Sequence, residues 1–235
     1  MAGRIYLMGA GPGDPELLTA KAHRVLSTCD AVFHDASVPE AILEIAPASA
    51  KRISMEKLNH PETADSIGEM AENSGVIAVL KAGDAFSFGD LSAEALALSE
   101  RGLGFHIVPG ISIPAGLGAA AGLPLTHRGD ARGVRFLRLD EDFSGLDWHG
   151  MADPECSLAV YGALADFGSF AQNLLDAGMS KNMPVAQFQG ETRAKRTTLW
   201  IAAEKGLDKS TSLVIIGKVA NVAETLESWI PREES

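Results

Sequence analysis

The sequence predicts an α/β protein with two α/β domains, a mostly parallel sheet in the first and a mixed sheet in the second. Three observations support this fold class. Short apolar runs alternate with helical stretches through the first half, which is typical of a parallel sheet with helices on both faces. After residue 180 strand-like runs outnumber helices, which favours antiparallel pairing. The segment 109–114 interrupts the alternation with two prolines and a glycine, so we expect domains at 1–111 and 112–235.

Composition narrows the class of protein further. With 46% hydrophobic and 22% charged residues, the 235-residue chain can bury a well-filled core. A net charge of −11 argues against a general nucleic-acid binder, because such proteins neutralise phosphates with basic side chains. No apolar run approaches the roughly 18 residues that span a membrane. We therefore expect neither nucleic acid nor a membrane as a partner.

The cysteines and the N-terminus bear on the compartment. Cys29 and Cys156 are far apart in the sequence and suit free thiols in a reducing environment. The N-terminus has no basic segment followed by an apolar stretch, so we expect no secretory signal. Both observations favour a cytoplasmic protein.

The first half contains five expected strands and four expected helices. The strands are the apolar runs 5–8, 31–33, 76–80 and 105–108, with a weaker run at 52–54. The helices between them are expected at 15–27, 39–46, 62–72 and 92–100. Ser92 can cap the last of these, and Gly102 can end it.

The second half is less regular. Strands are expected at 134–138, 157–161, 185–188, 197–201 and 212–216. Helices are expected at 115–121, at 165–177 with Gly178 as its end, and at 222–229. The polar stretch 140–154 has no hydrophobic period, so we expect a long loop there.

A glycine loop follows the first strand. Residues 9–13 place a glycine at every second position, which lets the backbone turn sharply and approach another molecule closely. The spacing differs from the dinucleotide fingerprint, Pro12 offers no amide to a phosphate, and Asp14 adds a negative charge. A ligand with a cationic or neutral head therefore suits this loop better than a nucleotide. The alternative is an ordinary tight turn in which Asp14 caps the following helix.

A second loop, 81–89, follows the strand 76–80 and contains Gly83 and Asp84. In a parallel sheet the carboxyl ends of these strands lie at the same edge, where open α/β sheets bind small ligands. The two loops are therefore expected to form one binding cleft. Asp84 could equally be a turn or helix-cap aspartate.

These loops and several other segments resemble those of the tetrapyrrole methylases. Residues 9–19 are similar to the family's opening motif, and 81–89 to its K-G-G-D-P-x-x-F-G loop. Further similar segments are 35–38, 108–112 and 122–129, with looser matches at 160–161, 184–186 and 212–219. The resemblance covers nearly the whole chain in order and spacing. The branch that it resembles most is that of the uroporphyrinogen-III C-methyltransferases, which leads to sirohaem and cobalamin.

The resemblance implies S-adenosylmethionine-dependent methyl transfer to a tetrapyrrole carbon in porphyrin, sirohaem or cobalamin biosynthesis. It points to uroporphyrinogen III as substrate and precorrin-2 as product, with S-adenosylhomocysteine as the second product. It also implies a homodimer, no metal ion, and a cofactor held mainly by backbone groups in a cleft between two α/β domains. The implied cofactor-binding residues are Pro12, Ala82, Gly83, Asp84, Ser87, Ser112, Ile113, Gly162, Ala186 and Ser212.

Catalysis and substrate binding are assigned from the chemistry of the reactants. A sulfonium methyl is already activated, so alignment and removal of a proton from the product carbon remain to be supplied. Asp35, after the second strand, is the candidate for this role; the alternative is a structural aspartate at a strand end. The tetrapyrrole carries several carboxylates, so Arg128 and Arg132 are expected in its pocket, with His127 as a further donor or a packed histidine. These arginines could also belong to a solvated basic face.

Several positions depart from the family pattern. Ala82 and Ala85 stand where a glycine and a proline are usual, Gly162 stands where a methionine is usual, and residues 90–94 replace R-G-G-E-E. The cofactor motifs are still kept better than the substrate side, because the change at residues 90–94 exchanges a cation for an anion at the rim of the expected substrate cleft. Another tetrapyrrole or precorrin methylase, a methylase of a modified histidine on a protein or of ribosomal RNA, and a weakly active homologue that binds the cofactor or a tetrapyrrole as a sensor remain alternatives. A dehydrogenase disagrees with the glycine spacing.

Overall fold

A computed structural model describes residues 3–73, 75–88, 91–139, 143, 145–162, 164–189 and 194–227. The chain divides into two compact units, Met1–Gly116 and Leu117–Ser235. The division falls inside helix α5 (Ile113–Ala120), a few residues after the expected boundary between 111 and 112. Within the described ranges, no helix combines the length and the apolar character that crossing a membrane requires.

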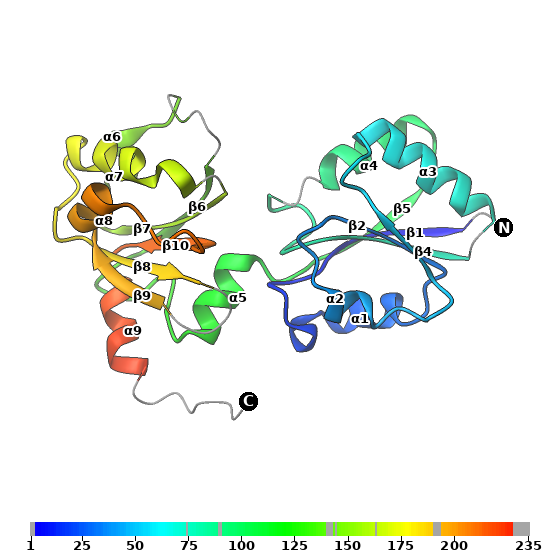
Figure 1. The fold of residues 1–235 in the computed structure, drawn as a ribbon, viewed down its shortest axis with the longest axis horizontal. Coiled ribbons are helices and arrows are strands. Elements are labelled where there is room, and N and C mark those ends of the chain that lie inside the picture. The colour runs from blue at the N-terminus through cyan, green and yellow to red at the C-terminus, as the bar shows by residue number, and fades with distance from the viewer. Residues whose placement is uncertain are drawn as a thin grey trace. The chain divides into compact units, whose positions relative to one another are not determined.

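The N-terminal unit contains a five-stranded sheet in the order β3-β2-β4-β1-β5, and every neighbouring pair is parallel (Figure 1). Its strands are β1 (Arg4–Gly9), β2 (Ala31–His34), β3 (Lys51–Ser54), β4 (Val76–Lys81) and β5 (Phe105–Val108). Each coincides with an expected strand, the weak run at 52–54 included. The parallel order brings the carboxyl ends of all five strands to one edge.

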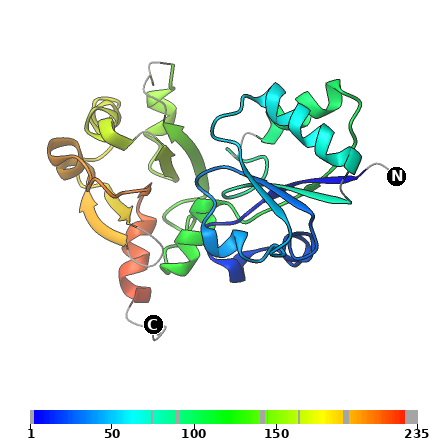
Figure 2. The ribbon, with the colours of Figure 1, turned by 45° about the vertical axis from the view of Figure 1, so that its right-hand side comes forward.

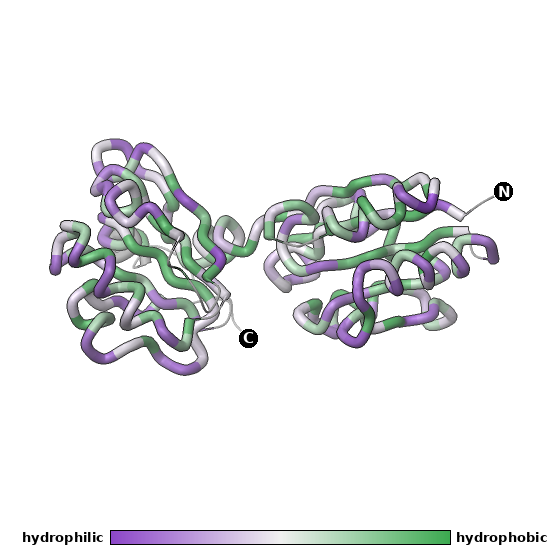
Figure 3. Tube along the Cα trace, turned by 90° about the horizontal axis from the view of Figure 1, so that it is seen from above, coloured by the Kyte–Doolittle hydropathy of each residue, from purple (hydrophilic) through white to green (hydrophobic). Residues whose placement is uncertain are grey.

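Helices cover both faces of this sheet (Figures 1 and 2). One face carries α1 (Ala20–Leu26) and α2 (Glu40–Leu43), and the other carries α3 (His60–Asn73) and α4 (Leu91–Glu100). Successive residues of a strand enter opposite cores because side chains alternate along it: Leu7 packs with α3 and α4, whereas Met8 packs with α1 and α2. Figure 3 shows the hydrophobic residues concentrated along the strands.

The starts of the helices in this unit agree only in part with the expected caps. The Asp14 side chain accepts a hydrogen bond from Glu16 N at 2.8 Å, as expected of a cap, but it begins only a short 3-10 helix, Pro15–Leu17. The Thr19 side chain caps α1 separately, so the expected single helix 15–27 is wrong. Ser92 is not a cap either, because α4 begins at Leu91.

Gly102 ends α4 as expected. Its φ of +69° places it in the left-handed region. The amides of Leu103 and Gly102 donate to the carbonyls of Leu98 and Ser99 at 3.0 and 2.9 Å, which is a Schellman motif.

The C-terminal unit contains a mixed five-stranded sheet in the order β6-β7-β10-β8-β9. The β6–β7 pair is parallel and the other pairs are antiparallel, which confirms the expected mixed sheet. The strands are β6 (Gly133–Leu139), β7 (Cys156–Gly162), β8 (Pro184–Phe188), β9 (Ala194–Thr198) and β10 (Leu213–Ile216).

The helices of this unit are α6 (Trp148–Met151), a 3-10 turn (Leu164–Asp166), α7 (Phe167–Asp176), α8 (Leu199–Lys205) and α9 (Val219–Glu227). The main core lies between the sheet and α6, α7 and α8, with Phe167 and Phe170 fully buried in it. Helix α7 stops at Asp176, and Gly178 follows it as the expected end, where the Met179 amide donates to Leu174 O at 3.0 Å.

Three expectations for this unit differ from the structure. The strand expected at 197–201 ends at Thr198, whose side chain accepts from Ile201 N and caps α8. Helix α6 lies within the expected loop 140–154, capped by Asp147; residues 140–142 and 144 of that loop lie outside the described residues. Helix α9 begins at Val219 rather than 222, and its expected last residues, 228–229, also lie outside the described residues.

Candidate functional site

Two glycine loops meet at the carboxyl edge of the N-terminal sheet. Gly11 and Gly83 form an isolated antiparallel bridge: Gly11 N donates to Gly83 O at 3.0 Å, and Gly83 N donates to Gly11 O at 2.7 Å. Beside this bridge, Ala10 N donates to Lys81 O at 2.8 Å. The two loops therefore lie side by side, as their positions after parallel strands predict.

A third loop, the one after β5, packs against the same point. A Cβ added at Gly9 would lie 2.4 Å from Gly83 O and 2.8 Å from Gly110 Cα. A Cβ added at Gly110 would lie 2.3 Å from Gly83 O. These separations are too short for any side chain, so only glycine allows the three backbones to touch. We call Gly9, Gly11, Gly83 and Gly110 the glycine junction.

The start of α5 lies against this junction. A Cβ at Gly83 would be in ordinary contact with Ile113 Cγ1 at 3.4 Å, and a Cβ at Gly116 would clash with Pro12 Cγ at 2.6 Å. Ser112 directly precedes the helix, and its carbonyl accepts from Gly116 N at 3.0 Å. The structure thus brings together the implied cofactor residues of this edge, which are Pro12, Ala82, Gly83, Ser112 and Ile113.

Asp84 organises the loop that follows β4. Its Oδ2 accepts from Gly110 N and its Oδ1 accepts from Phe86 N, both at 3.0 Å. Burial raises the pKa of this carboxyl group, but these bonds and those from Ser87 outweigh it and hold the pKa below its ordinary value. Asp84 is therefore an ionised turn aspartate that fastens the β4 loop to the β5 loop. Residues 89–90 lie outside the described residues.

Asp35 lies at the same edge, directly after β2. Its amide donates to Leu80 O at 3.4 Å, which places it beside the end of β4. Its Oδ1 accepts from Ser37 N at 2.9 Å and from Ser37 Oγ at 2.5 Å. The side chain is half-buried. Asp35 thus forms a local turn, in agreement with the alternative of a structural aspartate at a strand end. This turn lies at the end of β2, the strand next to β4, whose loop contributes to the glycine junction.

In the C-terminal unit, Gly162 and Ser212 share one end of the sheet. Leu213 pairs with Tyr161, so Ser212 lies beside Gly162, and Ser212 N donates to Phe188 O at 3.0 Å. Ala186 pairs with Ile215 deeper in the sheet and is fully buried. Gly162 has a φ of +98°, and a Cβ there would lie 2.6 Å from Leu139 O. This backbone conformation excludes the methionine that the family pattern has at position 162.

The three expected substrate residues lie on or next to one turn before β6. His127 and Ala131 exchange two backbone hydrogen bonds, and His127 Nδ1 lies 2.9 Å from Asp130 Oδ2. Arg128 is exposed. Arg132 forms an exposed ion pair with Glu155. Both His127 and Arg132 therefore have acidic neighbours within their own unit.

The structure also contains a buried charged cluster that no signal in the sequence predicts. Glu94, in the first turn of α4, is only 2% exposed. Its Oε1 lies 3.4 Å from Lys81 Nζ and 3.0 Å from His60 Nδ1. Glu94 stands in the segment 90–94, which departs from the family pattern, and no periodicity in the sequence links it to Lys81 or His60.

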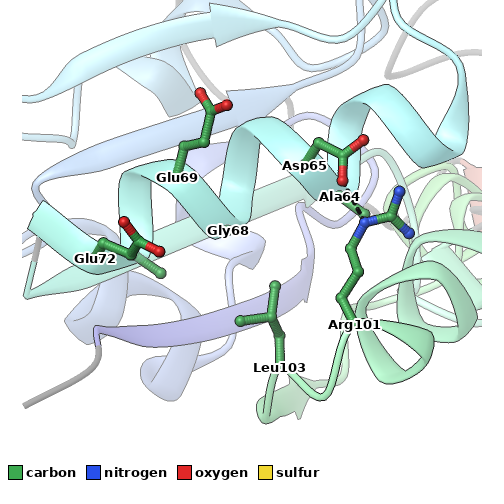
Figure 4. A pocket seen from close by; sticks show the side chains of 8 residues that line it. Ala64, Asp65, Gly68, Glu69, Glu72, Arg101 and Leu103 are labelled. Carbon is green, nitrogen blue, oxygen red and sulfur yellow. Dashed lines mark hydrogen bonds and ion pairs between the residues drawn. The ribbon is translucent and has the colours of Figure 1, made fainter.

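A surface pocket of about 260 Å³ lies elsewhere in the N-terminal unit, between α3 and the turn after α4 (Figure 4). Its lining residues are Ala64, Asp65, Gly68, Glu69, Ala71, Glu72, Arg101 and Leu103. An ion pair between Arg101 Nε and Asp65 Oδ1, 2.5 Å apart, joins its two sides. None of the expected site residues lines it.

Comparison with known proteins identifies the relatives of this chain. The family model described as Tetrapyrrole (Corrin/Porphyrin) Methylases matches residues 4–227. The uroporphyrinogen-III C-methyltransferase of Paracoccus denitrificans is 37% identical over 248 residues, covering 98% of this chain and 85% of that protein. The siroheme synthase of Chromobacterium violaceum is 34% identical over all of this chain, which spans only 53% of that protein's length.

A solved structure agrees with these relatives. The uroporphyrin-III C-methyl transferase of Thermus thermophilus, complexed with S-adenyl homocysteine, superposes with a TM-score of 0.79 at 32% sequence identity. The superposition covers 94% of this chain and 94% of that chain.

Proposed function

Since this chain belongs to the tetrapyrrole (corrin/porphyrin) methylases, we propose that it transfers a methyl group from S-adenosylmethionine to a tetrapyrrole carbon. We propose uroporphyrinogen III as the substrate, in line with the name of the Paracoccus denitrificans relative, and precorrin-2 as the product that the resemblance implies. The observation that carries this proposal is the glycine junction, where three strand-end loops touch through their backbones at the ligand-binding edge of a parallel sheet.

The residues at this edge fit the cofactor. At the glycine junction three loops meet through their backbones, with no side chain between them. Pro12 has no amide for a phosphate, and the ionised Asp84 would repel one. A sulfonium with an amino-acid head carries positive charge and no phosphate, so neither residue opposes it. When bound, S-adenosylmethionine supplies an activated methyl group.

In the N-terminal unit we propose that seven residues bind the cofactor, which are Pro12, Ala82, Gly83, Asp84, Ser87, Ser112 and Ile113. Asp84 acts there by holding the β4 and β5 loops together. The roles of Gly162, Ala186 and Ser212 in the C-terminal unit remain predictions from the resemblance.

Asp35 is proposed to orient the substrate or to accept the proton that leaves the methylated carbon. Its carboxylate is half-buried at the edge that carries the glycine junction, and both of its hydrogen bonds from Ser37 go to Oδ1. A positioned general base typically contributes about 10²–10⁴-fold to a rate.

His127, Arg128 and Arg132 are proposed to bind the carboxylates of the tetrapyrrole. Arginine suits this task because its planar guanidinium donates two parallel hydrogen bonds to a carboxylate. Arg132 is exposed in its ion pair with Glu155, and exposed pairs are worth at most about 1 kcal/mol. A substrate carboxylate can therefore replace Glu155 at little cost.

The direct test is incubation with isotopically labelled S-adenosylmethionine and uroporphyrinogen III, with the product followed by mass. Transfer of label to the tetrapyrrole is the expected result. The acidic neighbours of His127 and Arg132 favour one alternative, a sensor that binds the cofactor without using this substrate. Tight binding of S-adenosylhomocysteine without transfer to any tetrapyrrole would support the sensor.

We further propose that the protein is a cytoplasmic homodimer. Strand β5 is at an edge of its sheet, and Ile107 on it is 39% exposed, so this edge can accept a second copy. The proposed compartment rests on the free cysteines: Cys29 is buried, and burial raises the pKa of its thiol to about 11, which suits an unreactive free thiol in a reducing environment. Light scattering of the purified protein tests the dimer: a mass of one chain would contradict it.

A further inference from the structure

We propose that Glu94 is a positioning residue, which with Lys81 closes the base of the loop that carries four of the assigned cofactor residues. This inference rests on the proposed function, because the loop matters only if it binds the cofactor. We call the Lys81–Glu94 ion pair the clasp, and residues 82–88 the β4–α4 loop.

The clasp joins the two ends of this connection. Lys81 is the last residue of β4, and Glu94 lies in the first turn of α4. Their charged atoms are 3.4 Å apart, and the two side chains are 13% and 3% exposed. Every described residue of the β4–α4 loop lies between these two positions in the chain. Tying the ends together limits the conformations open to the loop.

The clasp also connects to the glycine junction. The Lys81 carbonyl accepts from Ala10 N at 2.8 Å, and Gly83, two residues further along, bridges to Gly11. A lysine fixed at its ammonium end and at its carbonyl holds the start of the loop in register with β1. The loop then carries Ala82, Gly83, Asp84 and Ser87 in a preset arrangement.

The clasp is a poor device for stability alone. Burying two charges costs desolvation, and apolar residues of similar volume are often equally stable in place of a buried ion pair. Glu94 uses only Oε1 for both Lys81 and His60, whereas Oε2 is buried without a hydrogen-bond partner among the described residues. A buried ion pair that is kept at this desolvation cost points to a role in placing the loop.

His60 adds a second contact from another element. It is the first residue of α3, its side chain is 49% exposed, and its Nδ1 lies 3.0 Å from Glu94 Oε1. Because water competes for this exposed imidazole, its contact holds Glu94 less firmly than the buried ammonium does. We therefore expect His60→Gln to change the amide exchange of the β4–α4 loop less than changes to the clasp do.

The test replaces both charges at once, so that no buried charge is left alone. The double variant Lys81→Met, Glu94→Leu keeps the volume and removes the clasp. Asp65→Asn is the matched control, because it removes the ion pair of Arg101 that joins α3 to the far end of α4. Three quantities are compared with the original protein: the thermal unfolding midpoint, amide hydrogen exchange of residues 82–88 without ligand, and the dissociation constant of S-adenosylhomocysteine.

The proposal predicts a double variant that unfolds at a similar temperature yet exchanges the amides of the β4–α4 loop faster. Its affinity for S-adenosylhomocysteine should fall about tenfold, because the loop must then be ordered on binding. Asp65→Asn should change neither the amide exchange of the β4–α4 loop nor the affinity for S-adenosylhomocysteine. Unchanged loop exchange in the double variant would overturn the clasp. Failure of the original protein to bind S-adenosylhomocysteine would instead overturn the proposed function, and the exchange measurement would still decide the clasp.

Discussion

The backbones of Gly11 and Gly83 exchange two hydrogen bonds, of 3.0 and 2.7 Å, although the residues are far apart in the chain. This bridge fixes the loop after β1 to the loop after β4. Gly110 completes the contact from the third side, where Asp84 accepts its amide hydrogen bond. The binding edge of the N-terminal unit is therefore built mainly from backbone, and changes to backbone shape should affect it most.

A first prediction concerns Gly110→Ala. Its Cβ would lie 2.3 Å from Gly83 O, so the three loops must separate. We expect a loss of about 1–3 kcal/mol in unfolding free energy, as for other overpacked sites. Affinity for S-adenosylhomocysteine should fall about tenfold or more, as calorimetry would measure.

Gly104→Ala is the matched control, because a Cβ there meets no atom within 4 Å. It should leave both quantities unchanged. Equal affinities for Gly110→Ala and Gly104→Ala would show that the glycine junction does not bind the cofactor.

A second prediction concerns the pH dependence contributed by Asp84. Its pKa is lower in the folded protein than in the unfolded chain, so its contribution to stability is present above the unfolded pKa of about 3.9. That contribution is lost as the pH falls through the folded pKa. Asp84→Asn should therefore be less stable than the original protein by about 1–3 kcal/mol at pH 7, with the difference shrinking in acid. Urea unfolding at pH 7 and in acid measures it, and a difference independent of pH would contradict this account.

A third prediction separates catalysis from cofactor binding. Asp35→Asn keeps an oxygen that can accept from Ser37 but cannot take up a proton. Methyl transfer should slow by about a hundredfold or more, while the dissociation constant of S-adenosylhomocysteine stays the same. A rate close to that of the original protein would show that Asp35 has only a structural role in its turn.

A fourth prediction concerns the substrate arginines. Arg128→Ala and Arg132→Ala should each raise the KM for the tetrapyrrole about tenfold, because each removes a charge-assisted hydrogen bond. The KM for S-adenosylmethionine should not change. Arg24→Ala, which alters an exposed arginine on α1, is the control. If all three variants behave alike, the turn before β6 does not bind the substrate.

Much of the fold could be predicted from the sequence because its signals are local. The strands of the N-terminal sheet are short apolar runs, and Gly102 and Gly178 end helices through backbone conformations that favour glycine. The boundary between β9 and α8 could not be found this way. A short run such as Leu199–Ile201 suits either a strand or a helix, and the Thr198 cap decided for the helix.

The site shows the same division. The two glycine loops could be placed at one edge, because parallel strands end together. The partners of Asp84 and Glu94 could not be predicted, since Gly110 and Lys81 come close to them only through the tertiary fold. The exclusion of methionine at position 162 likewise depends on the contact with Leu139 O.

The measurement that tests the central claim most directly is a calorimetric titration of the unmodified protein with S-adenosylhomocysteine, combined with amide hydrogen exchange of the complex. We expect one ligand per chain and slower exchange in residues 9–13, 81–88 and 110–113. Absence of binding heat for this ligand and for S-adenosylmethionine, or protection confined to other segments, would contradict the proposed role of the glycine junction.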